Sequence, residues 1–128
     1  MRLLLDTVAL LWIDSDDARV SRLARECFVD PANELFFSAV SAWEIAIKYS
    51  LGRLPLPCLP ADFVAAKTRA YKVSPLPLDE ESALYLPRLP RLHSDPFDRM
   101  LVCQSIVHGL AILSPDALIS QYPVRVRW

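Results

Sequence analysis

Short runs of apolar residues alternate along this chain with longer segments whose apolar residues recur at helical spacing. Residues 3–5, 35–37, 73–76 and 110–113 have the length and composition of strands that are buried on both faces. Helices are predicted around them at 9–13, 20–28, 41–51, 61–71, 79–86, 96–108 and 115–121. This alternation is typical of an α/β fold in which helices cover both faces of a parallel sheet.

The last residues of the sequence have a different pattern. Val124, Val126 and Trp128 alternate with Arg125 and Arg127, as in a strand with one exposed face. We therefore expect a central parallel sheet of four to five strands that is flanked by helices. A chain of 128 residues fits one domain, so residues 1–128 are predicted to form a single domain.

The composition favours a folded protein in a reducing compartment. Apolar residues make up 53% of the chain and charged residues 23%, which suits a packed core rather than a disordered chain. The three cysteines, Cys27, Cys58 and Cys103, are widely spaced, which argues against a disulfide framework or a zinc site. No apolar stretch approaches the roughly 18 residues of a membrane span, and Asp6 interrupts the apolar opening. We therefore expect a cytoplasmic protein with no signal peptide and no membrane segment.

Four acidic residues lie where predicted strands end or the next helices begin. Asp6 directly follows the first strand and Asp116 follows the fourth. Glu44 and Asp98 lie in the first turns of the helices predicted at 41–51 and 96–108. Right-handed crossovers bring the carboxyl ends of parallel strands to one edge of the sheet, where α/β proteins usually bind ligands. The four carboxylates are therefore expected to meet at that edge.

Each of these acids also has a purely structural explanation. Residues 41–44 read Ser-Ala-Trp-Glu and match a capping box, and residues 95–98 read Asp-Pro-Phe-Asp, an N-cap followed by proline at the first helical position. Asp6 precedes a predicted helix, whose backbone it could cap, and Asp116 lies near the start of another, where the helix dipole favours a carboxylate. For any one acid taken alone, the capping explanation is the more frequent one.

The four acids taken together favour a metal site. Two like charges about 4 Å apart repel by about 4 kcal/mol at an effective dielectric constant of roughly 20. A stable protein rarely gathers several carboxylates without a cation, and Mg²⁺ and Mn²⁺ prefer carboxylate oxygens. An acidic cluster that holds such ions is suited to phosphodiester cleavage, because the ions activate water and neutralise the phosphate.

The residues around these acids carry a resemblance to a known family. The segments are Leu-Leu-Leu-Asp-Thr at 3–7, Ser-Ala-Val-Ser-Ala-Trp-Glu-Ile at 38–45, His-Ser-Asp-Pro-Phe-Asp-Arg-Met-Leu at 93–101 and Leu-Ser-Pro-Asp at 113–116. They resemble the PIN-domain ribonucleases, and in particular the VapC-type toxins of type II toxin–antitoxin systems. The similarity covers nearly the whole chain, including 122–124 and Trp128. Its most specific part is His-x-Asp-Pro-Phe-Asp-Arg.

The resemblance implies a PIN-like domain, Mg²⁺ or Mn²⁺ as cofactor and RNA as substrate. It also implies a cognate antitoxin protein that blocks the site, and a homodimer. The implied site consists of the core acids Asp6, Glu44 and Asp98, the fourth acid Asp116, and two assisting hydroxyls, Thr7 and Ser114. Two positions depart from the family pattern: Val8 stands where related sequences often have histidine, and Pro115 directly precedes Asp116.

The overall charge does not by itself indicate nucleic-acid binding. The formal net charge is −1, and leaving out the four site acids changes it to +3. Five basic residues on segments next to the predicted site are candidates for contacts with RNA phosphates, with ordinary surface ion pairs as the alternative: Lys48, Arg53, Arg88, Arg91 and Arg99. For His93, a structural hydrogen bond in its loop is favoured over a contact with substrate.

Other functions remain as alternatives. Phosphatases with an aspartyl nucleophile carry an Asp-x-Asp motif after the first strand, whereas this chain has Val8 at the position of the second aspartate. A non-catalytic PIN-like module would keep the acids and bind RNA or a protein partner without cleavage. The third alternative is that the acids only cap helices. The metal-dependent ribonuclease is the function that uses all four acids.

Overall fold

The five strands form one sheet in which every neighbouring pair is parallel. The computed structural model describes residues 1–128, and the order across the sheet is β3-β2-β1-β4-β5. The strands are β1 (Arg2–Leu5), β2 (Glu34–Ser38), β3 (Ser74–Leu76), β4 (Ala111–Leu113) and β5 (Val126–Arg127). The prediction of an α/β fold with a parallel sheet of four to five strands is therefore confirmed.

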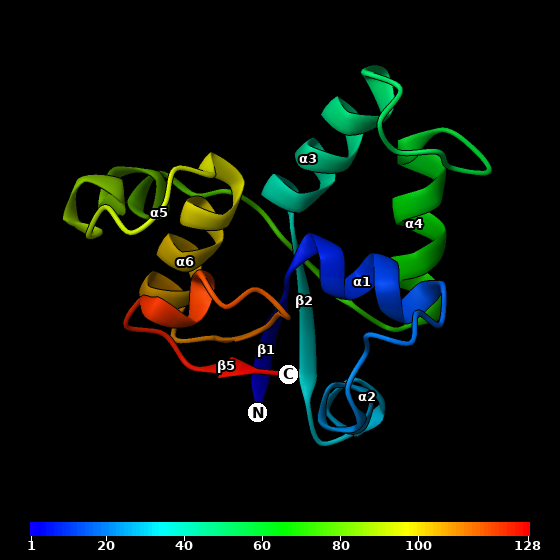
Figure 1. Ribbon diagram of the computed structural model, residues 1–128, viewed down its shortest axis with the longest axis horizontal. Coiled ribbons are helices and arrows are strands. Elements are labelled where there is room, and N and C mark those ends of the chain that lie inside the picture. The colour runs from blue at the N-terminus through cyan, green and yellow to red at the C-terminus, as the bar shows by residue number, and fades with distance from the viewer.

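Helices cover both faces of this sheet (Figure 1). One face carries α5 (Glu80–Tyr85) and α6 (Pro96–His108), and the other carries α1 (Thr7–Asp14), α2 (Arg22–Val29) and α4 (Pro60–Ala70). The remaining helix, α3 (Ala39–Ser50), starts directly at the carboxyl end of β2, at the upper edge of the sheet in Figure 1. None of the six helices is both long and apolar enough to span a membrane.

The central strand β1 explains the two-sided core. Successive side chains of a strand point to opposite faces, and a parallel sheet needs apolar residues on both. Leu3 and Leu5 pack in the cluster beneath α1 and α2, whereas Leu4 packs with Leu101 of α6 and Val40 of α3. The three leucines are fully buried, and β1 is the central strand of the sheet. The prediction of a strand buried on both faces at 3–5 is therefore confirmed.

The structure corrects the start of α3. This helix begins at Ala39 rather than at residue 41, because the hydroxyl of Ser38 caps it by accepting a hydrogen bond from the backbone N–H of Val40. The hydroxyl of Ser41 is buried and has no hydrogen-bond partner. Glu44 therefore lies beyond the first turn, and the predicted capping box at 41–44 is wrong.

The C-terminal part of the chain is less regular than its sequence pattern predicted. The helix expected at 115–121 is only a 3₁₀ turn, η2 (Ile119–Gln121), and the loop after α5 begins with another, η1 (Leu86–Arg88). The backbone N–H groups of Asp116 and Leu118 are taken by the side chains of Ser114 and Asp116. These local bonds satisfy the backbone in a turn, which competes with helix formation.

Candidate active site

The carboxyl edge of the sheet carries a cavity of about 330 Å³ that gathers all four predicted acids. Asp6 follows β1, Asp116 follows β4, Glu44 comes from α3 and Asp98 comes from α6. The residues that line the cavity are Asp6, Val8, Trp12, Glu44, Lys48, Asp95, Asp98, Pro115 and Asp116. The parallel topology thus brings together residues that are more than 100 positions apart in the sequence.

Asp6 directly follows β1 and is buried. It stands at the N-cap position of α1, yet its side chain makes no capping hydrogen bond. Its Oδ2 instead accepts a hydrogen bond of 2.7 Å from the hydroxyl of Ser114. Burial, followed by the charges of Glu44 and Asp116, raises the pKa of Asp6 to about 6, although the Ser114 bond acts in the opposite direction. The folded apo protein therefore disfavours an ionised Asp6.

Glu44 is held by one partner on each carboxylate oxygen. The hydroxyl of Thr7 donates to Oε1 at 2.7 Å, and the ammonium of Lys48 pairs with Oε2. Burial lowers the pKa of Lys48, but the hydrogen bond and the charge of Glu44 outweigh it, so that the pKa lies above its ordinary value. The two hydroxyls that the resemblance singled out, Thr7 and Ser114, thus each donate to a different acid of the cavity.

Asp98 lies in the first turn of α6, as predicted, behind a true N-cap. Oδ1 of Asp95 accepts hydrogen bonds from the backbone N–H groups of Phe97 at 2.9 Å and Asp98 at 3.1 Å. Burial comes first among the causes that raise the pKa of Asp98 to about 8, and the charges of Asp6, Asp95, Asp116 and Glu44 add to it. The mutual repulsion expected from the sequence is therefore present at this carboxylate.

Asp116 reaches the same cavity despite the proline before it. Its backbone N–H donates to the hydroxyl of Ser114 at 3.0 Å, and its Oδ1 accepts from the backbone N–H of Leu118 at 2.8 Å. These bonds fix the turn that follows β4 and leave the other carboxylate oxygen without a protein donor. Ser114 therefore links Asp6 and Asp116 through one hydroxyl.

Asp95 is a fifth carboxylate in the cavity that the sequence alone assigned only to capping. Capping uses its Oδ1, and its charge contributes to the raised pKa of Asp98. The signal that could have indicated its second role is its place within the most specific segment, three residues before Asp98.

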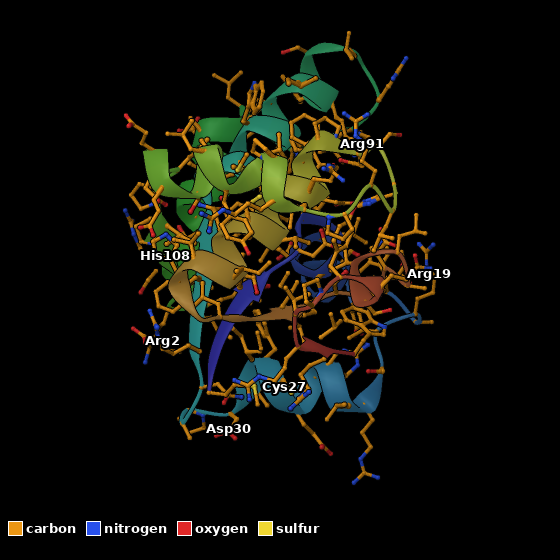
Figure 2. The ribbon with its side chains drawn as sticks, turned by 90° about the vertical axis from the view of Figure 1, so that its left-hand side faces the viewer. Arg2, Arg19, Cys27, Asp30, Arg91 and His108 are labelled. Carbon is orange, nitrogen blue, oxygen red and sulfur yellow. The ribbon has the colours of Figure 1, made fainter.

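The predicted basic residues do not gather at the acids. Of the five, only Lys48 lines the acidic cavity. Arg91 and Arg99 line a larger cavity of about 840 Å³, whose other lining residues are Leu86, Pro87, Leu89, Leu92, His93 and Ser94. Figure 2 places Arg91 on the loop before α6, at the opposite end of that helix from His108. Arg88 lies over the ring of Tyr85 at 5.6 Å, and Arg53 is exposed just beyond α3.

The cavity fits a divalent cation by the chemistry of its donors. Five carboxylates and a single ammonium group line it, and carboxylate oxygens are the ligands that Mg²⁺ and Mn²⁺ prefer. No three acidic, histidine or cysteine side chains are already spaced to hold one ion together. Glu44 is engaged by Lys48. The donor set is thus suitable, while its oxygens are not in a preformed coordination arrangement.

Sequence comparison identifies the family to which this fold belongs. The model of the PIN domain family matches residues 3–124. A curated relative, Ribonuclease VapC16 from Mycobacterium tuberculosis (strain ATCC 25618 / H37Rv), is 48% identical over 50 residues. This match covers 39% of the chain and 36% of that relative, so it spans little more than a third of the relative's length.

Solved structures with low sequence identity share the fold. DNA-bound VapBC from Salmonella typhimurium has a TM-score of 0.66 and 16% identity, with 98% of this chain and 96% of that chain covered. VapBC2 from Rickettsia felis, bound to a promoter DNA fragment, has a TM-score of 0.64 and 13% identity over 98% and 97%. Because the family model covers nearly the whole sequence, the chain belongs to the PIN domain family, and the predicted resemblance to VapC-type PIN domains is confirmed.

Proposed function

We propose that this protein is a metal-dependent endoribonuclease that hydrolyses RNA phosphodiester bonds and acts as the toxin of a toxin–antitoxin pair. The observation that carries the proposal is the one cavity that gathers Asp6, Glu44, Asp98 and Asp116 at the carboxyl edge of a PIN-domain sheet. The relative named Ribonuclease VapC16 supports the activity.

In this proposal Asp6, Glu44 and Asp98 hold Mg²⁺ or Mn²⁺, and Asp116 holds a second ion or orients the attacking water. The raised pKa values of Asp6 and Asp98 support it, because burial first, and the charges of the neighbouring acids second, disfavour their ionised forms when no cation is bound. A divalent cation bound there would neutralise the phosphate and make water a better nucleophile. Thr7 and Ser114 orient the carboxylates that they contact.

Cleavage would be in-line hydrolysis by water, with no covalent enzyme intermediate. No serine, cysteine or histidine side chain lines the acidic cavity, so the lining offers no ordinary protein nucleophile of those types. Lys48 is the one cation in the lining, so it is the candidate there for a contact with a phosphate. Arg53, Arg88, Arg91 and Arg99 are further candidates for phosphate contacts farther along the RNA, which would make RNA binding depend on salt.

The proposed partners follow from the same family. The structures with this fold include VapBC complexes from three bacteria, which supports a cognate antitoxin as the partner that blocks the acidic cavity. A homodimer and a cytoplasmic location are further parts of the proposal.

The test is an RNA cleavage assay on partner-free protein. We expect cleavage of a mixed RNA pool with Mn²⁺ or Mg²⁺ and none with EDTA, together with measurable binding of Mn²⁺ to the protein in the absence of RNA. A folded protein that neither binds Mn²⁺ nor cleaves RNA would contradict the proposal. Mn²⁺ binding without cleavage of any RNA in the pool would favour the non-catalytic module.

Replacing Thr7 by valine is expected to weaken Mn²⁺ binding and cleavage by about 10- to 100-fold. Valine keeps the shape of the buried side chain but removes the hydroxyl that donates to Glu44 at 2.7 Å. Thr7→Ser keeps the hydroxyl and is the matched control, for which we expect near-normal values. Titration of Mn²⁺ by electron paramagnetic resonance measures the affinity, and equal affinities for the two variants would argue against this role of Thr7.

A further inference from the structure

A continuous line of hydrogen bonds leads from the surface arginine of α6 to the carboxylate of Asp98. Nη1 of Arg99 donates to the hydroxyl oxygen of Tyr122 at 3.1 Å. That hydroxyl lies 2.8 Å from Nδ1 of His93, and Nε2 of the same ring lies 3.3 Å from Oδ2 of Asp98. His93 also forms the boundary of the larger cavity, while Asp98 lines the acidic one.

These contacts are compatible with a neutral ring of His93 that carries its proton on Nε2. The hydroxyl oxygen of Tyr122 accepts from Arg99, so its own hydrogen is free to be donated to Nδ1 of His93. A neutral imidazole that accepts at Nδ1 carries its hydrogen on Nε2. The remaining N–H therefore faces the carboxylate of Asp98, and only the carboxylate oxygen Oδ2 is engaged by it.

The surroundings hold this arrangement in place. The side chain of His93 is only 8% exposed, and Tyr122 is buried in the core cluster beneath α6. Arg99 also donates to the backbone carbonyls of Pro90 and His93, which ties the loop before α6 to the helix. Burial raises the energetic cost of any unpaired polar atom, so each member of the line keeps the next in one orientation.

We propose that His93 is a positioning residue for Asp98. Through the tautomer in which Nδ1 accepts from the hydroxyl of Tyr122, it donates its Nε2 hydrogen to Oδ2 and leaves Oδ1 as the oxygen that is available to a divalent cation. This inference rests on the proposed function, because it assigns Asp98 as a ligand. It gives the His-x-Asp-Pro-Phe-Asp-Arg segment a physical meaning, since His93 orients the acid, Asp95 caps the helix and Arg99 completes the line.

The first test compares two variants of His93 that separate its two contacts. The amide of glutamine can place an N–H donor near the position of Nε2, whereas the shorter amide of asparagine corresponds to Nδ1. We expect His93→Asn to weaken Mn²⁺ binding by about 10- to 100-fold and His93→Gln to restore most of it. Affinity is measured by electron paramagnetic resonance without RNA, and thermal unfolding with EDTA verifies that both variants fold. Equal loss of affinity in two folded variants would overturn the positioning role.

A second test needs no change of His93 and stands even if its variants do not fold. Nitrogen NMR of the metal-free wild-type protein above about pH 8, where Asp98 is ionised, should give the signature of a neutral ring protonated on Nε2. Tyr122→Phe, which removes only the hydroxyl, should abolish that fixed tautomer and weaken Mn²⁺ binding severalfold. A ring protonated on Nδ1 alone, or on both nitrogens, would overturn the inference. If wild-type protein binds no Mn²⁺, the proposed function fails with it; if it binds Mn²⁺ and His93→Asn binds equally well, only this inference fails.

Discussion

Replacing Asp98 by asparagine is expected to abolish metal-dependent RNA cleavage, with a loss of more than about 100-fold, which is the upper end for residues that only support a metal ligand. Asparagine keeps the shape of the side chain and can still accept the hydrogen bond from His93, but it removes a negative charge from the acidic cavity. The same change should weaken Mn²⁺ binding in the absence of RNA.

The stability of this variant separates a metal site from helix capping. With EDTA at neutral pH, the free energy of unfolding of Asp98→Asn should exceed that of the wild type by about 1 kcal/mol or more. The raised pKa shows that ionisation of Asp98 is unfavourable in the folded protein, and solvent screens part of this effect. If Asp98 only supported the first turn of α6, the variant would instead be less stable and show no change in its response to metal. Asp62→Asn on α4 is the matched control, since it makes the same substitution at an exposed carboxylate outside the cavity.

The free energy of unfolding of the metal-free protein is expected to fall by several kcal/mol between about pH 4 and pH 8. Asp6 and Asp98 have pKa values of about 6 and about 8 in the folded protein, above the ordinary value of 3.8. The folded state therefore binds more protons than the unfolded state in this range. The stabilising contribution of the two protonated carboxyls is fully present below about pH 4 and is lost as the pH rises through their two pKa values in the folded protein. The shift at buried Asp6 alone corresponds to roughly 3 kcal/mol.

Urea unfolding at several pH values, with EDTA and with Mg²⁺, measures this dependence. Mg²⁺ should restore stability most strongly near pH 8, where the carboxylates are ionised, by about 2.7 kcal/mol at a free concentration 100 times its dissociation constant. The low pKa values of Asp17 and Asp79 act at a different pH, because their stabilising contributions are lost only as the pH falls below about 4. Stability that rises steadily from pH 4 to pH 8 with EDTA would contradict the repulsion among the acids.

The sequence by itself determined the fold class and the edge of the sheet at which the acids meet. The run at 3–5 is apolar at every position, as expected for a strand buried on both faces of a parallel sheet, and β1 lies at the centre of such a sheet. Once the sheet is parallel, residues that follow its strands must lie at one edge. Asp6 and Asp116 therefore share a cavity although the sequence separates them widely.

The tertiary structure alone decided what holds each acid in place, because these contacts join residues that no local pattern connects. Local patterns assigned Glu44 to a capping box, but Ser38 caps α3, and Glu44 is held by Thr7 from α1 and by Lys48. That Asp95 lines the acidic cavity as well as capping α6 likewise follows only from the way α6 packs in the fold. Periodicity and capping rules describe hydrogen bonds within a few residues, whereas the line from Arg99 through Tyr122 and His93 to Asp98 closes only after β4 and the C-terminal turn have packed against α6.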